Sequence, residues 1–178
     1  MRIISGKYKG RQLNVPKGLP VRPTTDRTKE ALFNILNNEL YWEDTDVLDL
    51  FSGTGNISLE AWSRGARSVT SVDQNGKCVA TIKKLAGELK INDAKVIQMN
   101  VWQYVRNCTD QFDLIFMDPP YAMPQQEDLV KLIFERGLLK PKGLLVVEHT
   151  TQLTMQSSSN FEFEKVYGSS TLSFFINE

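Results

Sequence analysis

Residues 47–56 read Val-Leu-Asp-Leu-Phe-Ser-Gly-Thr-Gly-Asn, and this stretch indicates the fold. Its first five residues are almost entirely apolar, which is typical of a buried strand in a parallel sheet. Gly53 and Gly55 then permit a tight turn, because glycine tolerates backbone angles that other residues avoid. A helical pattern follows from Ile57 to Arg64. Strand, glycine turn and helix in this order predict a doubly wound α/β fold with a nucleotide-like ligand at the turn.

The glycine spacing narrows the class of ligand. A dinucleotide fingerprint would place a third glycine at position 58, which is Ser58 here, so a pyrophosphate cradle is poorly supported. An adenosine ligand without phosphates fits better. A second apolar strand, 68–72, leads to Asp73, which lies 20 residues beyond Gly53. That spacing is expected of a carboxylate that accepts hydrogen bonds from ribose hydroxyls, so the pattern predicts an S-adenosylmethionine site.

A third buried strand is predicted at 114–117, and Asp118-Pro119-Pro120-Tyr121 follows it directly. The exocyclic amine of a base is a poor nucleophile, because its lone pair is delocalised into the ring, and an enzyme must hold and polarise it. Asp118 and a backbone carbonyl beside the prolines can accept its N–H bonds, while Tyr121 offers a flat surface for stacking. The tetrapeptide therefore suggests an amine methyltransferase. The alternative is an ordinary turn, since Asp-Pro-Pro also ends strands.

Length and composition predict one compact domain over residues 1–178, with 41 % hydrophobic residues to form its core. The sequence has no 18-residue apolar run and no basic segment followed by an apolar one at its start. We therefore expect a soluble cytoplasmic protein with no membrane partner. One histidine and two cysteines do not make a metal cluster, so no metal site is predicted.

The net charge is zero, but the charges are unevenly distributed. Residues 1–29 carry a charge of +7 and the remainder carries −7. Residues 1–21 are interpreted as a basic arm for nucleic-acid phosphates, folded as a short β-hairpin that displays Lys7, Lys9 and Arg11. Arg22 and Arg27 flank the predicted start of a helix that Thr24, Thr25 or Asp26 can cap, and such a helix start can bind a phosphate. Leu32, Ile35 and Leu36 fall on one face of this helix. The alternative is a solvated hairpin and an ordinary capped helix.

Residues 22–178 are expected to form the catalytic core, in which helices and strands alternate as in a doubly wound domain. Two alternating segments near the end predict an antiparallel strand pair, after a polar surface loop at 150–160. The remaining predicted elements are helices at 30–36, 78–89, 101–106 and 127–136, strands at 95–99 and 144–148, and a turn at 141–143.

With these motifs in place, the chain resembles the RsmD family of bacterial 16S ribosomal RNA guanine-N2 methyltransferases. The likeness covers nearly the full length, and it implies a Rossmann-like, mostly parallel seven-stranded sheet with a C-terminal antiparallel pair. It also implies S-adenosyl-L-methionine as cofactor and 16S ribosomal RNA, within an assembling 30S subunit, as partner of a monomer. The resemblance rests on residues 1–7, 10–11, 22–27, 31–36, 48–55, 59–61, 63–66, 112–121 and 167–168.

The motifs and the resemblance together define the expected site. Asn100 stands where the family usually has an acid, and Gln74 stands where a second carboxylate is common. Asn100 can still accept a hydrogen bond through its amide oxygen. The cofactor is expected at Asp49, Phe51, Ser52, Gly53, Thr54, Gly55, Asp73, Gln74, Asn100 and Val101. Catalysis is expected at Asp118, Pro119, Pro120 and Tyr121, and RNA at Arg2, Lys7, Lys9, Arg11, Arg22, Thr24 and Arg27.

Two other functions remain open at the level of the sequence. The same tetrapeptide would suit adenine N6 in DNA or a glutamine amide in a protein, since each presents a planar amine. The small size without a target-recognition domain argues against DNA, and the basic arm argues against a protein substrate. An RNA-binding assembly factor with a relic cofactor pocket is the non-enzymatic alternative.

Overall fold

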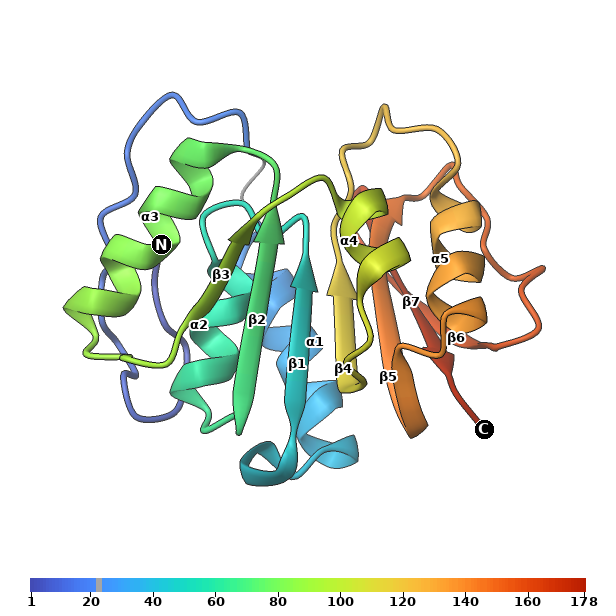
Figure 1. Cartoon of the computed structure of the whole chain (residues 1–178), viewed down its shortest axis with the longest axis horizontal. Coiled ribbons are helices and arrows are strands. Elements are labelled where there is room, and N and C mark those ends of the chain that lie inside the picture. Colours follow the sequence, from blue (N-terminus) through green and yellow to red (C-terminus); the bar gives the residue numbers. More distant parts are fainter. Residues whose placement is uncertain (22–23) are drawn as a thin grey trace.

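Seven strands form one twisted sheet in the order β3-β2-β1-β4-β5-β7-β6 (Figure 1). The computed structural model describes residues 1–21 and 24–178. Strands β1 to β5 are parallel, and β7 runs antiparallel between β5 and β6. The strands are β1 (Asp46–Leu50), β2 (Ser68–Asp73), β3 (Lys95–Gln98), β4 (Phe112–Met117), β5 (Leu139–Thr150), β6 (Phe161–Tyr167) and β7 (Ser170–Ile176). The predicted seven-stranded sheet and its C-terminal antiparallel pair are confirmed.

Helices cover both faces of the sheet, so most strands are buried on both sides. Helices α1, α2 and α3 share one core with the N-terminal segment, and α4 and α5 pack into the other core. A short 3-10 turn, η1, leads into β1. The helices are α1 (Asp26–Glu39), η1 (Trp42–Asp44), α2 (Asn56–Ser63), α3 (Gly76–Glu88), α4 (Val101–Asn107) and α5 (Gln126–Glu135).

The strand register brings the predicted motifs to one edge of the sheet. Leu50 of β1 pairs with Val72 of β2 on one side and with Met117 of β4 on the other. The glycine turn, Asp73 and Asp118 therefore begin at the same level, where parallel strands end. Chain order reverses between β1 and β4, and such a switch point opens a crevice between the loops that leave the two strands.

Two details of the predicted elements are wrong. The expected turn at 141–143 lies inside β5, because Leu139 pairs with Phe112 while Leu144 pairs with Leu114, so the residues between them form an irregular bulge. On α1, Ile35 was placed on one face with Leu32 and Leu36, but it is only partly buried, and Phe33 is fully buried in its place. The 3.6-residue repeat of a helix is compatible with either Phe33 or Ile35 on the inward face, and the packing of α1 against the sheet determines that it is Phe33.

The predicted N-terminal hairpin is present, but its antiparallel pairing consists of one bridge, Arg2 to Gln12. Ile3 and Leu13 are buried in the core shared with α1 and α2. The segment is therefore a narrow loop packed onto the body of the protein. No helix within the described part of the chain is both long enough and apolar enough to cross a membrane.

Lys29 was counted in the +7 charge of residues 1–29, but the structure shows that its charge does not lie at the surface. Its side chain is 1 % exposed and pairs with Glu60 of α2. Lys29 stands one helical turn before Leu32 and Phe33 on the buried face of α1, so its position in the helix repeat carries it inward. It therefore contributes no charge to the surface of the arm.

Candidate active site

The glycine turn after β1 is built from an uncommon backbone conformation. Phe51 has φ of 58° and Gly55, the N-cap of α2, has φ of 84°. The Ser52 N–H donates to the Val72 carbonyl at 3.1 Å, and the Gly55 N–H donates to the Ser52 carbonyl at 2.8 Å. A left-handed phenylalanine stores local strain, which surrounding contacts must hold, and such strain gathers at ligand sites.

Asp73 holds the same turn from the end of β2. Its Oδ2 accepts from the Gly53 N–H at 2.8 Å, and its Oδ1 accepts from the Asn75 N–H at 2.8 Å. Each carboxylate oxygen has two acceptor sites, so hydroxyl donors can still bind to the second site on each. The side chain is partly exposed, as a residue that receives ribose hydroxyls must be.

Asp49 is buried behind the glycine turn and bonds to the first turn of α2. The residue is 1 % exposed. Its Oδ2 accepts from the Ser58 N–H at 3.1 Å and from the Ser58 hydroxyl at 2.5 Å, and that hydroxyl also bonds to Ser71. Burial raises the pKa of Asp49 to about 7, against the opposing effect of the Ser58 donors. This geometry makes Asp49 a support that joins β1 to the start of α2.

The side-chain hydroxyl of Ser52 bears on whether the glycine turn can bind a polar ligand. Its hydroxyl is buried and has no hydrogen-bond partner among the residues that the structure describes. An unpaired buried hydroxyl in a native protein calls for an explanation, and a ligand donor or acceptor at the turn would supply one. The residues of the turn thus fit a polar adenosine-type group.

The loops after β2 and β3 carry the remaining residues that were expected to contact the cofactor, Gln74, Asn100 and Val101. The Asn100 amide oxygen accepts from the Gln103 N–H at 3.3 Å and thereby caps α4. Its amide nitrogen lies 3.4 Å from the Gln74 amide oxygen. Val101 is buried beside them. The acceptor expected for an adenine amine is thus already in use as a helix cap, although its second lone pair can serve a ligand.

The tetrapeptide begins beside the glycine turn. The Asp118 N–H lies 3.5 Å from the Leu50 carbonyl of β1. Pro119 is buried, and the Pro120 carbonyl accepts from the Met123 N–H at 2.8 Å, which closes the loop after β4. Tyr121 is 38 % exposed, and its hydroxyl bonds to Ser170 Oγ at 2.9 Å.

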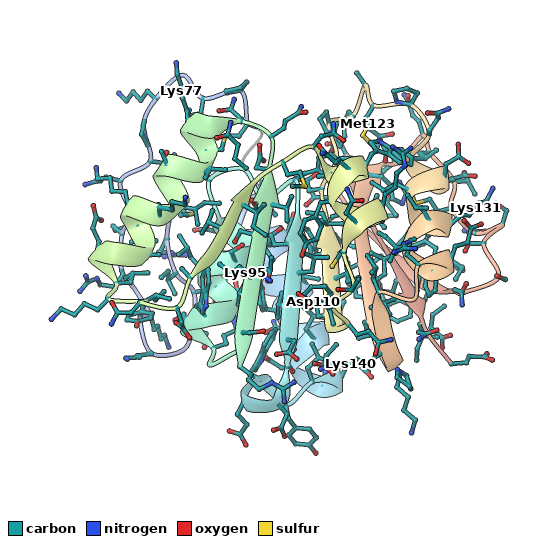
Figure 2. The ribbon with its side chains drawn as sticks, in the orientation of Figure 1. Lys77, Lys95, Asp110, Met123, Lys131 and Lys140 are labelled. Atoms are coloured by element: carbon teal, nitrogen blue, oxygen red, sulfur yellow. The ribbon has the colours of Figure 1, made fainter. Side chains whose placement is uncertain are left out.

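An open hollow of about 360 Å³ adjoins the Tyr121 ring. It lies between the loop after β4, the start of α5 and the end of β5, and Figure 2 shows Met123 at that end of the sheet, opposite Lys140. The residues that line it are Tyr121, Met123, Pro124, Gln125, Gln126, Glu127, Asp128, Thr150 and Leu153. An aromatic wall and nearby acceptors suit a flat heterocycle that carries N–H donors.

The residues predicted to contact RNA lie in different environments. Lys7, Lys9 and Arg11 are exposed on the N-terminal loop. Arg27 is exposed on the first turn of α1, and Arg2 is half-exposed and paired with Asp26 at 3.2 Å. The hydroxyl of Thr24 donates to Glu148 Oε2 at 3.3 Å, which places Thr24 near the carboxyl end of β5. Arg22 lies outside the described residues.

Three polar residues around α2 were not recognised in the sequence. The buried Lys29 and Glu60 and the partly buried Asn56 form a cluster that joins α1, α2 and the N-terminal loop. Lys29 could have been found, because it falls on the apolar face of α1. Glu60 sits among the buried Leu59 and Ala61 and gives no such periodic signal.

Comparison with known proteins identifies the family. The model of the family described as conserved hypothetical protein 95 matches residues 1–176. Ribosomal RNA small subunit methyltransferase D of Escherichia coli (strain K12) is 32 % identical, over 94 % of this chain and 85 % of that protein. The chain belongs to the RsmD family.

Solved structures agree with the RsmD assignment. The Escherichia coli protein yhhF, named as a methyltransferase, superposes with a TM-score of 0.89 at 32 % identity, over 100 % of this chain and 98 % of that chain. An RNA methyltransferase from Salinibacter ruber, solved with S-adenosyl-L-homocysteine, has a TM-score of 0.69 at 16 % identity, over 87 % and 93 % of the two chains. This second likeness shows the fold. The predicted family and the Rossmann-like methyltransferase fold are both confirmed.

Proposed function

We propose that the chain transfers a methyl group from S-adenosyl-L-methionine to the N2 amine of a guanine in 16S ribosomal RNA. One observation carries the proposal. The pairing of β1 with β4 puts the glycine turn and Asp118 side by side at the switch point of the sheet. A methyl donor at the turn and an amine at the tetrapeptide would then be neighbours. Membership in the RsmD family supports the choice of ribosomal RNA.

The residues that would hold the cofactor come from three neighbouring strand ends. Residues 51–55 would surround its amino-acid and ribose parts, and Asp73 would accept from the ribose hydroxyls, with Gln74 beside it. Asn100 and Val101 would flank the adenine. The cofactor supplies an electrophilic methyl group on a sulfonium. The unpaired Ser52 hydroxyl supports the presence of a polar ligand here.

The protein's own part in the reaction is to extract, hold and orient the amine. Removing guanine from its stack costs a few kcal/mol unless the RNA is already open. Stacking on Tyr121, worth about 1–3 kcal/mol, offsets this cost. The Asp118 carboxylate and the Pro119 carbonyl then accept the two N2–H bonds and aim the lone pair. Holding two reactants at near-attack distance lowers the barrier by about 7–11 kcal/mol. After transfer, Asp118 or solvent takes the proton that the methylated amine releases.

The N-terminal loop would supply the phosphate contacts. Lys7, Lys9 and Arg11 are exposed together on this loop, with Arg27 on α1, and together they give the RNA a basic surface on an otherwise acidic protein. In this proposal the protein acts in the cytoplasm, as a monomer, on naked 16S RNA or on a partly assembled 30S subunit.

Transfer of labelled methyl groups tests the proposal directly. Purified protein is incubated with methyl-labelled S-adenosyl-L-methionine and with 16S RNA or 30S subunits from cells that lack the protein. Mass mapping should find N2-methylguanosine at one position. N6-methyladenosine or labelled protein would instead support one of the other amine substrates. A relic pocket would give no saturable cofactor binding by calorimetry, and that result would leave only the assembly-factor alternative.

A further inference from the structure

Lys29 of α1 joins three parts of the chain through one buried ammonium. Nζ donates to the Arg2 carbonyl at 2.6 Å and to Asn56 Oδ1 at 2.8 Å, and it lies 3.4 Å from Glu60 Oε2. An ammonium has three donors, and these three acceptors match them. Burial lowers the pKa of Lys29, and Glu60 opposes that shift. Lys29 Nζ therefore connects the N-terminal loop to the first residue and to the middle of α2.

Glu60 extends this connection along the N-terminal loop. Its side chain is 0 % exposed. Its Oε2 accepts from the Ile4 N–H at 2.9 Å, and its Oε1 accepts from the Ser5 N–H at 3.0 Å. Arg64, one turn further along α2, donates to Oε1 at 2.9 Å. A buried carboxylate of α2 thus pairs with two backbone donors of the loop.

The last residue of α2 holds the next part of the loop. The Ser63 carbonyl accepts from the Lys7 N–H at 2.7 Å, and the Ser63 hydroxyl accepts from the Tyr8 N–H at 3.0 Å while donating to the Ser5 carbonyl at 2.6 Å. The contact is close, since a Cβ on Gly6 would lie 1.9 Å from the Ser63 carbonyl oxygen. The segment that displays the basic side chains is therefore fastened to α2.

The first residue of α2, Asn56, is connected through Thr24 to the carboxyl end of β5. Asn56 follows Gly55 of the glycine turn directly, and its amide nitrogen donates to the Thr24 carbonyl at 3.2 Å. Thr24 in turn donates to Glu148 of β5. Asn56 thus links the cofactor turn, the buried Lys29 and the segment that leads into α1.

We infer that α2 couples RNA binding at the N-terminal loop to cofactor binding at the glycine turn, with Ser63 and Asn56 as positioning residues at its two ends. The inference rests on the proposed function, which supplies both ligands. Asn56 and Ser63 are about 10 Å apart along a stiff helix at 1.5 Å per residue. A ligand that restrains one end of α2 also restricts the motion of the other end. The second ligand then loses less conformational entropy when it binds. Each ligand should therefore raise the affinity for the other by the same factor.

Equilibrium dialysis with labelled S-adenosyl-L-homocysteine, which cannot donate a methyl group, measures the coupling. Binding is compared with and without saturating 16S RNA or 30S subunits, and filter binding verifies saturation for each protein variant. In the wild type, RNA should tighten cofactor-product binding at least about fivefold. Ser63→Ala should bring this factor close to one. Ser63 lies at the end of α2 that is far from the glycine turn. The affinity of the Ser63→Ala variant for S-adenosyl-L-homocysteine without RNA should therefore stay within about twofold of wild type.

Asn56→Ala should also lower the coupling factor, and two matched variants serve as controls. Ser68 donates to Asp46 at 2.7 Å and Asn107 donates to the Gln103 carbonyl at 3.0 Å, both outside α2. Ser68→Ala and Asn107→Ala should keep the full factor. The inference is overturned if the wild type binds both ligands independently, or if Ser63→Ala loses thermal stability but keeps the factor. Absence of any saturable cofactor-product or RNA binding would instead reject the proposed function, and the inference with it.

Discussion

Asp73, the last residue of β2, accepts a hydrogen bond from the Gly53 backbone N–H at 2.8 Å. The residue expected to bind the ribose thus also holds the turn on which the cofactor would rest. Replacing Asp73 by Asn puts an amide N–H against one of two backbone donors and removes a charged acceptor. A hydrogen bond to a charged group contributes about 1.5–3 kcal/mol, so affinity for S-adenosyl-L-homocysteine should fall about 10- to 150-fold. Calorimetry measures this, and an unchanged affinity would exclude Asp73 from the cofactor site.

Asp118 should act on the reaction and not on cofactor affinity. Asp118→Ala removes the acceptor that orients the amine, and we expect turnover at saturating substrates to fall about 100-fold or more. Affinity for S-adenosyl-L-homocysteine should change little. Asp110→Ala is the matched control, because Asp110 is an exposed partner of Lys95 at 3.2 Å (Figure 2). A large loss of cofactor affinity in Asp118→Ala would contradict the assigned role.

The ring and the hydroxyl of Tyr121 should have separable effects. Tyr121→Phe keeps the aromatic ring and loses the 2.9 Å contact of the hydroxyl with Ser170, so kcat/KM for RNA should fall less than about fivefold. Tyr121→Ala also loses base stacking, worth about 1–3 kcal/mol, and kcat/KM should fall about 5- to 150-fold. Steady-state kinetics distinguishes the two. Equal losses in both variants would show that the hydroxyl, and not the ring, matters.

Asp49 should make the stability of the free protein depend on pH. Its pKa is raised to about 7 in the folded state, while an unfolded aspartate titrates near 4. Between these values the folded state keeps a proton that the unfolded state has released, so stability decreases as pH rises from about 4 to 7. The limit of this effect is about 4 kcal/mol, from three pKa units.

Asp49→Asn removes the titrating group and keeps an acceptor for Ser58. The free energy of unfolding of the wild type, measured in urea relative to this variant, should therefore fall between about pH 4 and 7 and level off above. Other carboxylates cancel in the difference. A difference that does not vary over this range would show that Asp49 titrates normally in the folded protein.

The N-terminal loop should set the salt dependence of RNA binding. Each lost phosphate contact reduces the slope of log affinity against log salt concentration by about 0.7 to 0.9, so replacing Lys7, Lys9 and Arg11 by Ala should lower it by about 2. Lys131→Ala, on the outer face of α5, should leave the slope unchanged. Filter binding over a range of salt concentrations gives the slopes. Equal slopes for the triple variant and the wild type would place the RNA elsewhere.

Local patterns were enough to predict the parts of the site that follow strands. Residues 51–55, Asp73 and Asp118 each stand directly after an apolar run, and parallel strands end at the same edge of a sheet. Their proximity thus follows from the α/β pattern once the strands are recognised. The bulge in β5 could not be predicted in this way, because Pro141 and Gly143 give the same local signal in a turn between strands and in an irregular strand.

The sequence by itself determined the family, the order of helices and strands, and which residues leave the carboxyl ends of the strands. Only the tertiary structure decided that Lys29 is buried, that Asp49 supports Ser58 from below, and that the N-terminal loop is fastened along α2. These outcomes depend on partners far away in the chain, such as Glu60 for Lys29. A charged residue looks the same in a sequence whether water or a distant carboxylate compensates its charge, and only packing reveals which one does.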